Sequence, residues 1–293
     1  MAAFELNVNL ITALAEAKDP RLSYLWTAVS IAQQAGAMIK DAFEKSKEIK
    51  TKACSTDLVT ETDQKVEDFI KKSINEQYPD HCFIGEETVS GGEKCVLTDR
   101  PTWIVDPVDG TTNFVHRFPF VAVSIAIAIN KEIEIAVIYG CILEKLYIAV
   151  KGQGSYCGQE KISVSQRTDL SDALILTEWG SNRDPDRLNT IGSNIIKVAG
   201  RPSGPAHGVR SVGSAALNMA LIASGCADVY YEWGIHCWDM AAGKLIIEEA
   251  GGVVLSTSGE SFDLLGCNVL CGSSGVLLSQ VSEQLTQISV ERD

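Results

Sequence analysis

Residues 103–116 read WIVDPVDGTTNFVH, and the interpretation of the whole chain depends on this stretch. Its apolar start, Trp103 to Val105, predicts a short buried strand that ends in the carboxylate of Asp106. Asp109 follows three residues later, and Gly110 then frees the backbone for a turn. A strand that ends in two acids followed by small polar residues places negative charge at a sheet edge. The stretch therefore predicts a site for metal and phosphate chemistry.

Length and charge limit what the chain can do. It has 293 residues, enough to bury a large core without disulfides or structural metals. Lys and Arg number 25 against 38 Asp and Glu, a formal net charge of −13. An acidic chain repels phosphate backbones and anionic lipids, so nucleic acid and membranes are excluded as general partners. No apolar run reaches the ~18 residues of a membrane span, and no signal-peptide pattern opens the sequence.

The nine cysteines are scattered along the chain and form no C-x-x-C pair. This usage is typical of reduced, mostly buried thiols, and we expect a cytoplasmic protein. A thiolate metal site is the alternative, which the cysteine spacing disfavours.

Apolar spacing predicts how helices and strands follow one another. Alternation within residues 120–150 predicts a meander of strands, so at least part of a sheet is antiparallel. Helices are predicted at 22–43, 62–78, 185–199, 214–223, 238–250 and 276–288, and further strands at 82–84, 174–176, 227–231, 253–255 and 269–270. Residues 44–61 read as an extended excursion and 201–208 as a loop. We expect one α/β domain over residues 1–293, with two sheet regions meeting near residue 163. Residues 1–19 would be a weakly helical N-terminal extension.

Acidic residues stand where three of the predicted elements begin or end. Glu86 follows one strand, Asp106 and Asp109 follow another, and Asp239 opens a helix. In α/β proteins, ligands bind in a crevice outside the carboxyl ends of strands, so we expect these acids to converge. Carboxylate oxygens are hard ligands and suit Mg²⁺ or Mn²⁺ better than Zn²⁺.

The turn after the second acid cluster offers further groups. Pro107 has no N–H to donate, and the turn would expose the carbonyl of Val108 as an additional metal ligand. If Gly110 and Thr111 open a helix, their N–H groups point at an anion such as phosphate.

Three motifs in this order resemble the inositol monophosphatase family: GEE at 85–87, DPVDGTTNFVH at 106–116 and GIHCWDMAAG at 234–243. The likeness extends from about Leu22 to Ile288 and is nearest to the animal enzymes. It implies a layered αβαβα sandwich, an α/β (α+β) fold of the inositol monophosphatase/fructose bisphosphatase type. It also implies two or three Mg²⁺ ions, sensitivity to lithium and a homodimer.

The resemblance also implies a role for each residue that matches a motif. Thr111 would hold the attacking water, supported by Asp63 of the TETD stretch at 60–63, and Glu86 is a further catalytic candidate. The implied metal ligands are Glu86, Asp106, Val108 (through its carbonyl), Asp109 and Asp239. The implied substrate-binding residues are Glu86, Val108, Asp109, Gly110, Thr111, Gly213, Ser214, Ala215, Glu232 and Asp239.

Several of these side chains have a purely structural interpretation as well. Asp63 could serve simply as a cap of the 63–78 helix, because Asp is a favoured capping residue, and the two roles are compatible. Glu232 could be an ordinary charge after a strand, and Asp239 an acid at a helix start. His236 is better explained as a hydrogen-bonded neighbour of the site than as a metal ligand. Lys52 is by default a solvated side chain in a loop near the site.

The function that these motifs favour is Mg²⁺-dependent hydrolysis of myo-inositol monophosphates by an activated water. A rival of the same class is a phosphatase for fructose bisphosphate, a nucleotide 3′-phosphate or another sugar phosphate. A rival of a different class is a non-catalytic phosphopolyol-binding or regulatory protein, which a lost carboxylate would indicate; none of the three motifs lacks one.

Overall fold

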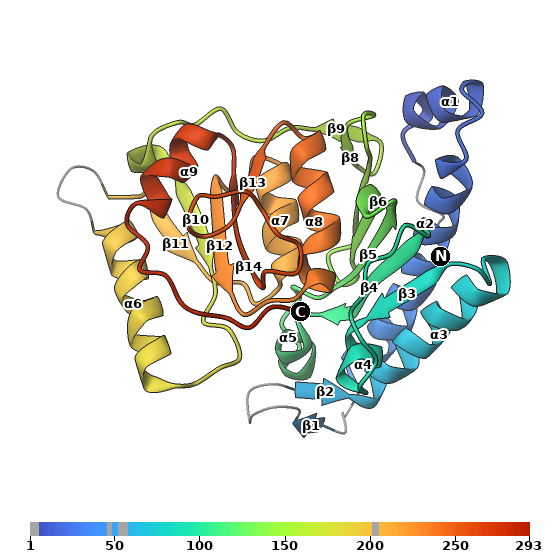
Figure 1. Ribbon diagram of the computed structural model, residues 1–293, viewed down its shortest axis with the longest axis horizontal. Coiled ribbons are helices and arrows are strands. Elements are labelled where there is room, and N and C mark those ends of the chain that lie inside the picture. Colours follow the sequence, from blue (N-terminus) through green and yellow to red (C-terminus); the bar gives the residue numbers. More distant parts are fainter. Residues whose placement is uncertain (1–5, 46–48, 52–57, 201–204) are drawn as a thin grey trace.

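The structure is a computed structural model that describes residues 6–45, 49–51, 58–200 and 205–293. Helices and sheets alternate in layers across the molecule (Figure 1). This arrangement confirms the layered α/β fold expected from the sequence. Lys52 and the first part of the predicted 201–208 loop lie outside the described residues.

The first sheet holds the stretch with which the sequence analysis began. Its strands, in spatial order, are β3 (Cys82–Gly85), β4 (Thr102–Asp109), β5 (Ala122–Ile129), β6 (Glu132–Gly140), β7 (Lys145–Val150), β8 (Ser155–Cys157) and β9 (Glu160–Ile162). β3 pairs parallel with β4, and each later pair is antiparallel, so the predicted meander is confirmed. Helices α2 (Arg21–Phe43) and α3 (Glu61–Gln77) cover its outer face.

The second sheet begins after residue 163, as the sequence predicts. In spatial order it contains β11 (Gly208–Arg210), β10 (Leu174–Thr177), β12 (Val229–Trp233), β14 (Asn268–Gly272) and β13 (Val253–Leu255). Helices α7 (Ala215–Ala223) and α8 (Cys237–Glu249) fill the layer between the two sheets. Helices α6 (Pro185–Ala199) and α9 (Gly275–Ser282) lie on the far side of the second sheet (Figure 1).

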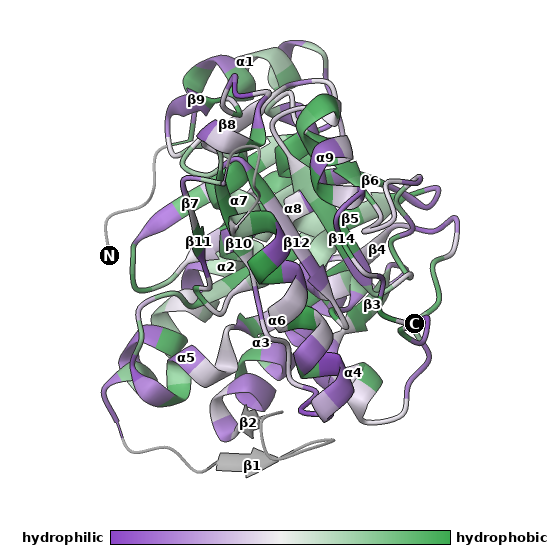
Figure 2. Cartoon of the chain, turned by 90° about the vertical axis from the view of Figure 1, so that its left-hand side faces the viewer, coloured by the Kyte–Doolittle hydropathy of each residue, from purple (hydrophilic) through white to green (hydrophobic). Residues whose placement is uncertain are grey.

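Strand β4 is buried along its whole length because helices cover both faces of its sheet. Trp103 and Val105 belong to the apolar cluster with α2 and α3, whereas Ile104 belongs to the cluster with α7 and α8. Successive side chains of a strand point to opposite faces, which explains this division. Figure 2 shows the same distribution, with hydrophobic residues concentrated on the inner strands and helices.

Short elements complete the described chain. They are α1 (Val8–Glu16), β1 (Ile49–Thr51), β2 (Leu58–Thr60), α4 (Glu86–Ser90), α5 (Thr111–His116) and a 3₁₀ turn at Leu170–Asp172. Both α4 and α5 begin directly after a strand of the first sheet, which places their N-terminal ends at the same edge. No helix in the described part of the chain combines the length and the apolar character that a bilayer crossing requires.

Several boundaries differ from the sequence predictions. Leu10 and Leu14 of α1 are buried against α2, so this segment is a packed helix and not the weakly helical extension that the sequence predicts. The last helix ends at Ser282 and not near Ile288. Gly208 begins a strand that pairs with β10, although a loop was predicted there.

The last two differences concern strands that carry acids. β12 extends to Trp233, so Glu232 lies inside the strand and does not follow it. β4 likewise continues through both of its acids to Asp109, because β5 keeps pairing with it beyond Val105.

Candidate active site

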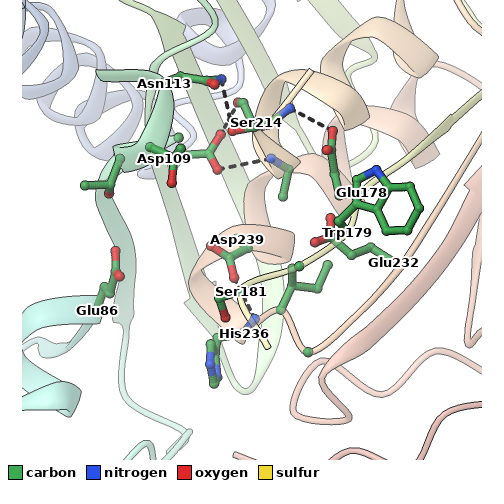
Figure 3. A pocket seen from close by; sticks show the side chains of 18 of the residues that line it. Glu86, Asp109, Asn113, Glu178, Trp179, Ser181, Ser214, Glu232, His236 and Asp239 are labelled. Atoms are coloured by element: carbon green, nitrogen blue, oxygen red, sulfur yellow. Dashed lines mark hydrogen bonds between the residues drawn. The ribbon is translucent and has the colours of Figure 1, made fainter. Parts of the chain in front are cut away.

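A pocket of about 400 Å³ opens where several helices begin and strands end (Figure 3). The residues that line it come from the starts of α4, α5, α7 and α8 and from the segments after β10 and β12. Helix N-termini carry partial positive charge and free N–H groups, so this edge favours an anionic ligand. Among the predicted site residues, the lining contains Glu86, Asp109, Gly110, Thr111, Gly213, Ser214, Ala215, Glu232 and Asp239.

Three carboxylates converge at this pocket, two of which, Asp109 and Asp239, line it. One ligand oxygen each of Asp106, Asp109 and Asp239 lies within 4.8 Å of the others. Residues three apart on a regular strand face opposite sides, so Asp106 and Asp109 would normally diverge. The pairing of β4 with β5 shifts register between these two residues, and this irregularity brings both acids to one side.

Local hydrogen bonds hold two of the acids in place. The backbone N–H of Val108 donates to Asp106 Oδ1 over 2.9 Å. Asp109 accepts hydrogen bonds from the Ser214 hydroxyl and from the backbone N–H groups of Ala215 and Ala216. The two bonds from the backbone are each 3.1 Å long. Asp109 is therefore a cap for α7, a helix that belongs to the central layer.

The acids of this cluster repel one another in a buried site. Burial, reinforced by the charges of Glu86, Asp109 and Asp239, raises the pKa of Asp106 well above its usual range. Burial and the charge of Asp239 raise the pKa of Asp109 to about 7. Burial also raises the pKa of Asp239 to about 6. A bound cation would remove this repulsion, so the oxygen-only cluster fits a hard divalent metal.

Thr111 lies beside this cluster and contacts two other predicted residues. Its hydroxyl is 3.0 Å from Asp63 Oδ1 and 3.1 Å from the carbonyl oxygen of Val108. Asp63 also accepts hydrogen bonds from the backbone and the side chain of Thr60 at the start of α3. Asp63 is thus both a helix cap and a partner of Thr111, the combination that the sequence left open. Burial raises the pKa of Asp63 to about 6.

Glu86 faces the carboxylate cluster from the start of α4 (Figure 3). It is not one of the three acids within 4.8 Å of each other, but its charge raises the pKa values of Asp106 and Asp239. Glu67 of α3 holds this helix: its carboxylate accepts from the N–H groups of Glu87 and Thr88, each over 2.7 Å. The sequence analysis did not identify Glu67.

The opposite side of the pocket carries a second pair of acids. Glu232 is buried inside β12 and accepts a hydrogen bond from Tyr230. Burial and the charge of Glu178 raise the pKa of Glu232 well above its usual range. Glu178 follows β10 and accepts from the N–H groups of Val212 and Gly213 over 2.7 and 2.8 Å. Sequence reasoning missed Glu178, although an acid directly after a strand was the signal used for the other acids.

Backbone segments from the two sheets meet closely beside Gly110. Gly110 has a φ of +88°, and a Cβ there would lie 2.7 Å from the carbonyl oxygen of Phe120. Asn113 connects the two sides, because its amide nitrogen donates to the carbonyl oxygens of Phe120 and Val212 over 2.8 and 2.7 Å. Gly213, at φ +74°, leaves room for this amide. The small residues of the 103–116 stretch therefore allow the two sides of the pocket to approach each other closely.

His236 lies at the rim and is hydrogen-bonded, as the sequence analysis expected. Its Nδ1 lies 2.6 Å from Asp293 Oδ1, and its ring stacks on Trp238 with centroids 4.7 Å apart. Its backbone N–H donates to Asp239 Oδ2 over 2.6 Å. His236 thus positions the turn that carries Asp239.

Comparison with known proteins gives a consistent result. The model of the Inositol monophosphatase family matches residues 22–290. Inositol monophosphatase 1 of Rattus norvegicus is 49% identical over 275 residues, covering 94% of this chain and 98% of that protein. Inositol monophosphatase 1 of Homo sapiens is 48% identical with the same coverage. The solved structure of the extragenic suppressor protein suhB from Bartonella henselae has a TM-score of 0.81 at 30% identity, covering 90% of this chain and 99% of that chain.

Proposed function

Because this chain belongs to the inositol monophosphatase family, we propose that it hydrolyses myo-inositol monophosphates to inositol and phosphate with bound metal ions. The main support for the proposal is that Asp106, Asp109 and Asp239 converge beside Thr111, near the N-terminal ends of several helices. A phosphate monoester is a dianion. An acidic pocket can accept it only when cations and helix N-termini supply the opposite charge.

We propose Mg²⁺ as the metal, two or three ions in all, held by Glu86, Asp106, the Val108 carbonyl, Asp109 and Asp239. The donor set supports this choice, because every donor is an oxygen. Bound Mg²⁺ would polarise the phosphoryl oxygens and lower the pKa of water. Bound cations would offset the burial and mutual repulsion that raise the pKa values of the three clustered acids.

Thr111, Asp63 and Glu86 are proposed as the residues that prepare the water. The Thr111 hydroxyl can donate its single proton to Asp63 or to the Val108 carbonyl, so its oxygen remains an acceptor for water. As the water oxygen bonds to phosphorus, the bond from phosphorus to the inositol oxygen breaks, and that oxygen takes a proton from solvent. The proton that the attacking water loses is later returned to solvent, so none is gained or lost overall. With a pKa of about 6, Asp63 can take up the proton that water releases through Thr111.

The remaining predicted residues are proposed to hold the substrate. The N–H groups of Gly110 and Thr111 at the start of α5 would bind the phosphate. Glu232, with Gly213, Ser214 and Ala215, would bind the inositol hydroxyls. A buried carboxylate suits this task, because a carboxylate accepts hydrogen bonds from hydroxyl groups and a phosphate does not approach it.

Phosphate release tests the proposal. Purified protein is assayed with inositol 1-phosphate, fructose 1,6-bisphosphate and adenosine 3′-phosphate, each with Mg²⁺ and with a chelator. We expect hydrolysis of inositol 1-phosphate to exceed the others, and to stop when the metal is removed. Preference for another phosphate would support the same-class rival, and binding without turnover would support the non-catalytic one.

Assembly and inhibition follow from the resemblance and are proposed on that basis. We expect a homodimer, which size-exclusion chromatography with light scattering measures directly. We also expect lithium chloride to reduce phosphate release at saturating Mg²⁺; an unchanged rate would contradict this expectation.

A further inference from the structure

A second group of metal-binding side chains lies outside the carboxylate cluster. Cys95 comes from the segment between α4 and β4, Cys237 is the first residue of α8, and Asp293 ends the chain. The two cysteine sulfurs are 3.4 Å apart, and a ligand atom of each of the three residues lies within 4.8 Å of the other two. Residues 142 and 56 positions apart have therefore been brought together, which cysteine spacing alone could not reveal.

The donor types distinguish this group from the oxygen-only floor of the pocket. Thiolates favour softer metals, and Zn²⁺ commonly combines Cys sulfur with Asp oxygen or His nitrogen. Zinc–sulfur bonds of about 2.3 Å at a tetrahedral angle place two sulfurs about 3.8 Å apart. The separation of Cys95 and Cys237 is a few tenths of an ångström shorter. We propose that Cys95, Cys237 and Asp293 form a binding site for one divalent cation of the zinc class.

Neighbouring groups hold the carboxylate in position. Asp293 Oδ1 is hydrogen-bonded to His236 Nδ1 over 2.6 Å, and Oδ2 accepts from the N–H of Cys237 over 3.0 Å. The backbone N–H of Asp293 also donates to the carbonyl of Leu265 over 3.0 Å. Partners of this kind orient the ligands of metal sites and strengthen binding. His236, Cys267 and Asp293 satisfy the same 4.8 Å limit, so four other side chains of metal-binding type gather around the carboxylate of Asp293.

An entry path exists for an ion. Cys95 and Asp293 line a pocket of about 490 Å³ that is distinct from the candidate active site. Cys237 is fully buried behind them, whereas Cys95 is half-buried. A site with three protein ligands then has an open side, where water can complete a tetrahedral shell. The pocket is lined by Lys131, Lys244 and Arg292 and also by Glu132 and Asp263, so its charges are mixed.

A simple thiol pair accounts for less of the geometry. Two sulfurs at this distance could also be oxidised to a disulfide. A disulfide would make no use of the carboxylate of Asp293, although one of its oxygens lies within 4.8 Å of both sulfurs. The convergence of two sulfurs with an oriented carboxylate therefore favours a cation over a disulfide.

Cobalt is a suitable probe, because Co²⁺ replaces Zn²⁺ and absorbs in the near ultraviolet when thiolates bind it. Reduced full-length protein is kept in excess Mg²⁺, which occupies the carboxylate cluster, and titrated with Co²⁺ under a non-thiol reductant. We expect the thiolate-to-cobalt band to saturate at one equivalent and to disappear when Zn²⁺ is added. Absence of the band in fully reduced protein would overturn the proposal.

Variants assign the band to particular residues. Cys95→Ser and Cys237→Ser should each reduce the affinity for Co²⁺ by about tenfold to a hundredfold. Asp293→Asn should weaken binding by about tenfold and keep the thiolate band. Cys226→Ser, which changes an exposed cysteine outside the group, is the matched control and should bind like the parent. If the buried Cys237 variant fails to fold by circular dichroism, the half-buried Cys95 variant decides; parental binding by Cys95→Ser would overturn the site.

Discussion

The two walls of the candidate active site are built in different ways. The wall from the first sheet takes Asp106, Val108, Asp109 and Thr111 from six consecutive residues at the end of β4 and the start of α5. The facing wall takes its acids from the ends of β10 and β12 and its backbone donors from the start of α7. The side chains of the first wall are thus encoded locally, whereas those of the facing wall are assembled from distant segments.

The two walls also differ in how their charges are compensated. Glu178 accepts two backbone N–H groups and the amide of Asn218, so protein dipoles largely satisfy it. Asp106 accepts a single backbone N–H in the midst of other acids. Asp106 would therefore gain more from a bound cation than Glu178, which the protein itself compensates. Substitutions on the two walls should affect turnover and substrate binding to different extents.

Asp106→Asn should have the largest effect. Asn keeps an oxygen that can accept the Val108 N–H, but it removes a charged metal ligand. Loss of several kcal/mol of charge stabilisation corresponds to a fall in kcat of about a thousandfold or more. Steady-state phosphate release at several Mg²⁺ concentrations measures it, and circular dichroism checks the fold. A turnover near that of the parent would show that the first wall does not hold the catalytic metal.

Thr111→Ala should come next, with kcat reduced by about a hundredfold and KM changed little, because a positioned hydroxyl acts mainly in the transition state. Thr112→Ala is the matched control, since the adjacent Thr112 side chain is exposed. Its effect should stay within a few-fold. A raised KM with an unchanged kcat in Thr111→Ala would assign that residue to substrate binding instead.

Glu232→Gln should raise KM for inositol 1-phosphate by about tenfold, because one hydrogen bond to a charged group contributes roughly 1.5 kcal/mol or more. The same variant should hydrolyse p-nitrophenyl phosphate as the parent does, since that ester has no sugar hydroxyls. The ratio of the two kcat/KM values is the measurement. A parallel loss on both esters would place Glu232 in the chemistry and remove the distinction between the walls.

The smallest effect concerns pH. Burial raises the pKa values of Asp109 and Asp239 to about 7 and 6, so the metal-free folded protein holds protons that the unfolded chain releases near pH 4. Protonation of these two acids therefore stabilises the folded state fully at a pH below their pKa in the unfolded chain. This stabilisation is lost as pH rises through their folded pKa values of about 6 and 7. The unfolding temperature of metal-free protein should fall by a few degrees between pH 5.5 and 8.

Saturating Mg²⁺ should remove most of this slope, because the ion takes the place of the protons. Apparent Mg²⁺ affinity should in turn weaken as pH falls below 7, where Asp109 is protonated, and more steeply below 6, where Asp239 is protonated as well. Differential scanning fluorimetry with and without Mg²⁺ measures both trends. A metal-free melting temperature that rises over this range would contradict the assignment of the acids as a repelling cluster.

The same contrast explains what the sequence could predict. Asp106, Asp109 and Glu86 directly follow apolar runs in the sequence, so local pattern was enough to group them with Asp239, although β4 in fact continues through Asp106 to Asp109. The register shift in β4 was not predictable, because it depends on how β5 pairs with it. Asn113 was noticed only as a small polar residue, since its bond to Val212 joins segments 99 positions apart.

Glu67 carries a sequence signal of its own, an acid on the apolar face of a predicted helix. It lies between Val66 and Ile70 on the buried face of α3, and it is 3% exposed. A charged residue on the apolar face of a helix is almost never buried without a partner. That position could have predicted an inward hydrogen-bonding role. Its partners, the N–H groups at the start of α4, still required the fold.

Helix α1 has a consequence for how the protein should be produced. The family match starts at residue 22, but α1 ends at Glu16 and buries Leu10 and Leu14 against the apolar cluster of α2. Arg21 ties the same region to Asp19 and to Glu134 of β6. An expression clone trimmed to the family boundary would uncover an apolar strip, which promotes self-association. Helix α1 should therefore be retained when monodisperse protein is to be produced in good yield.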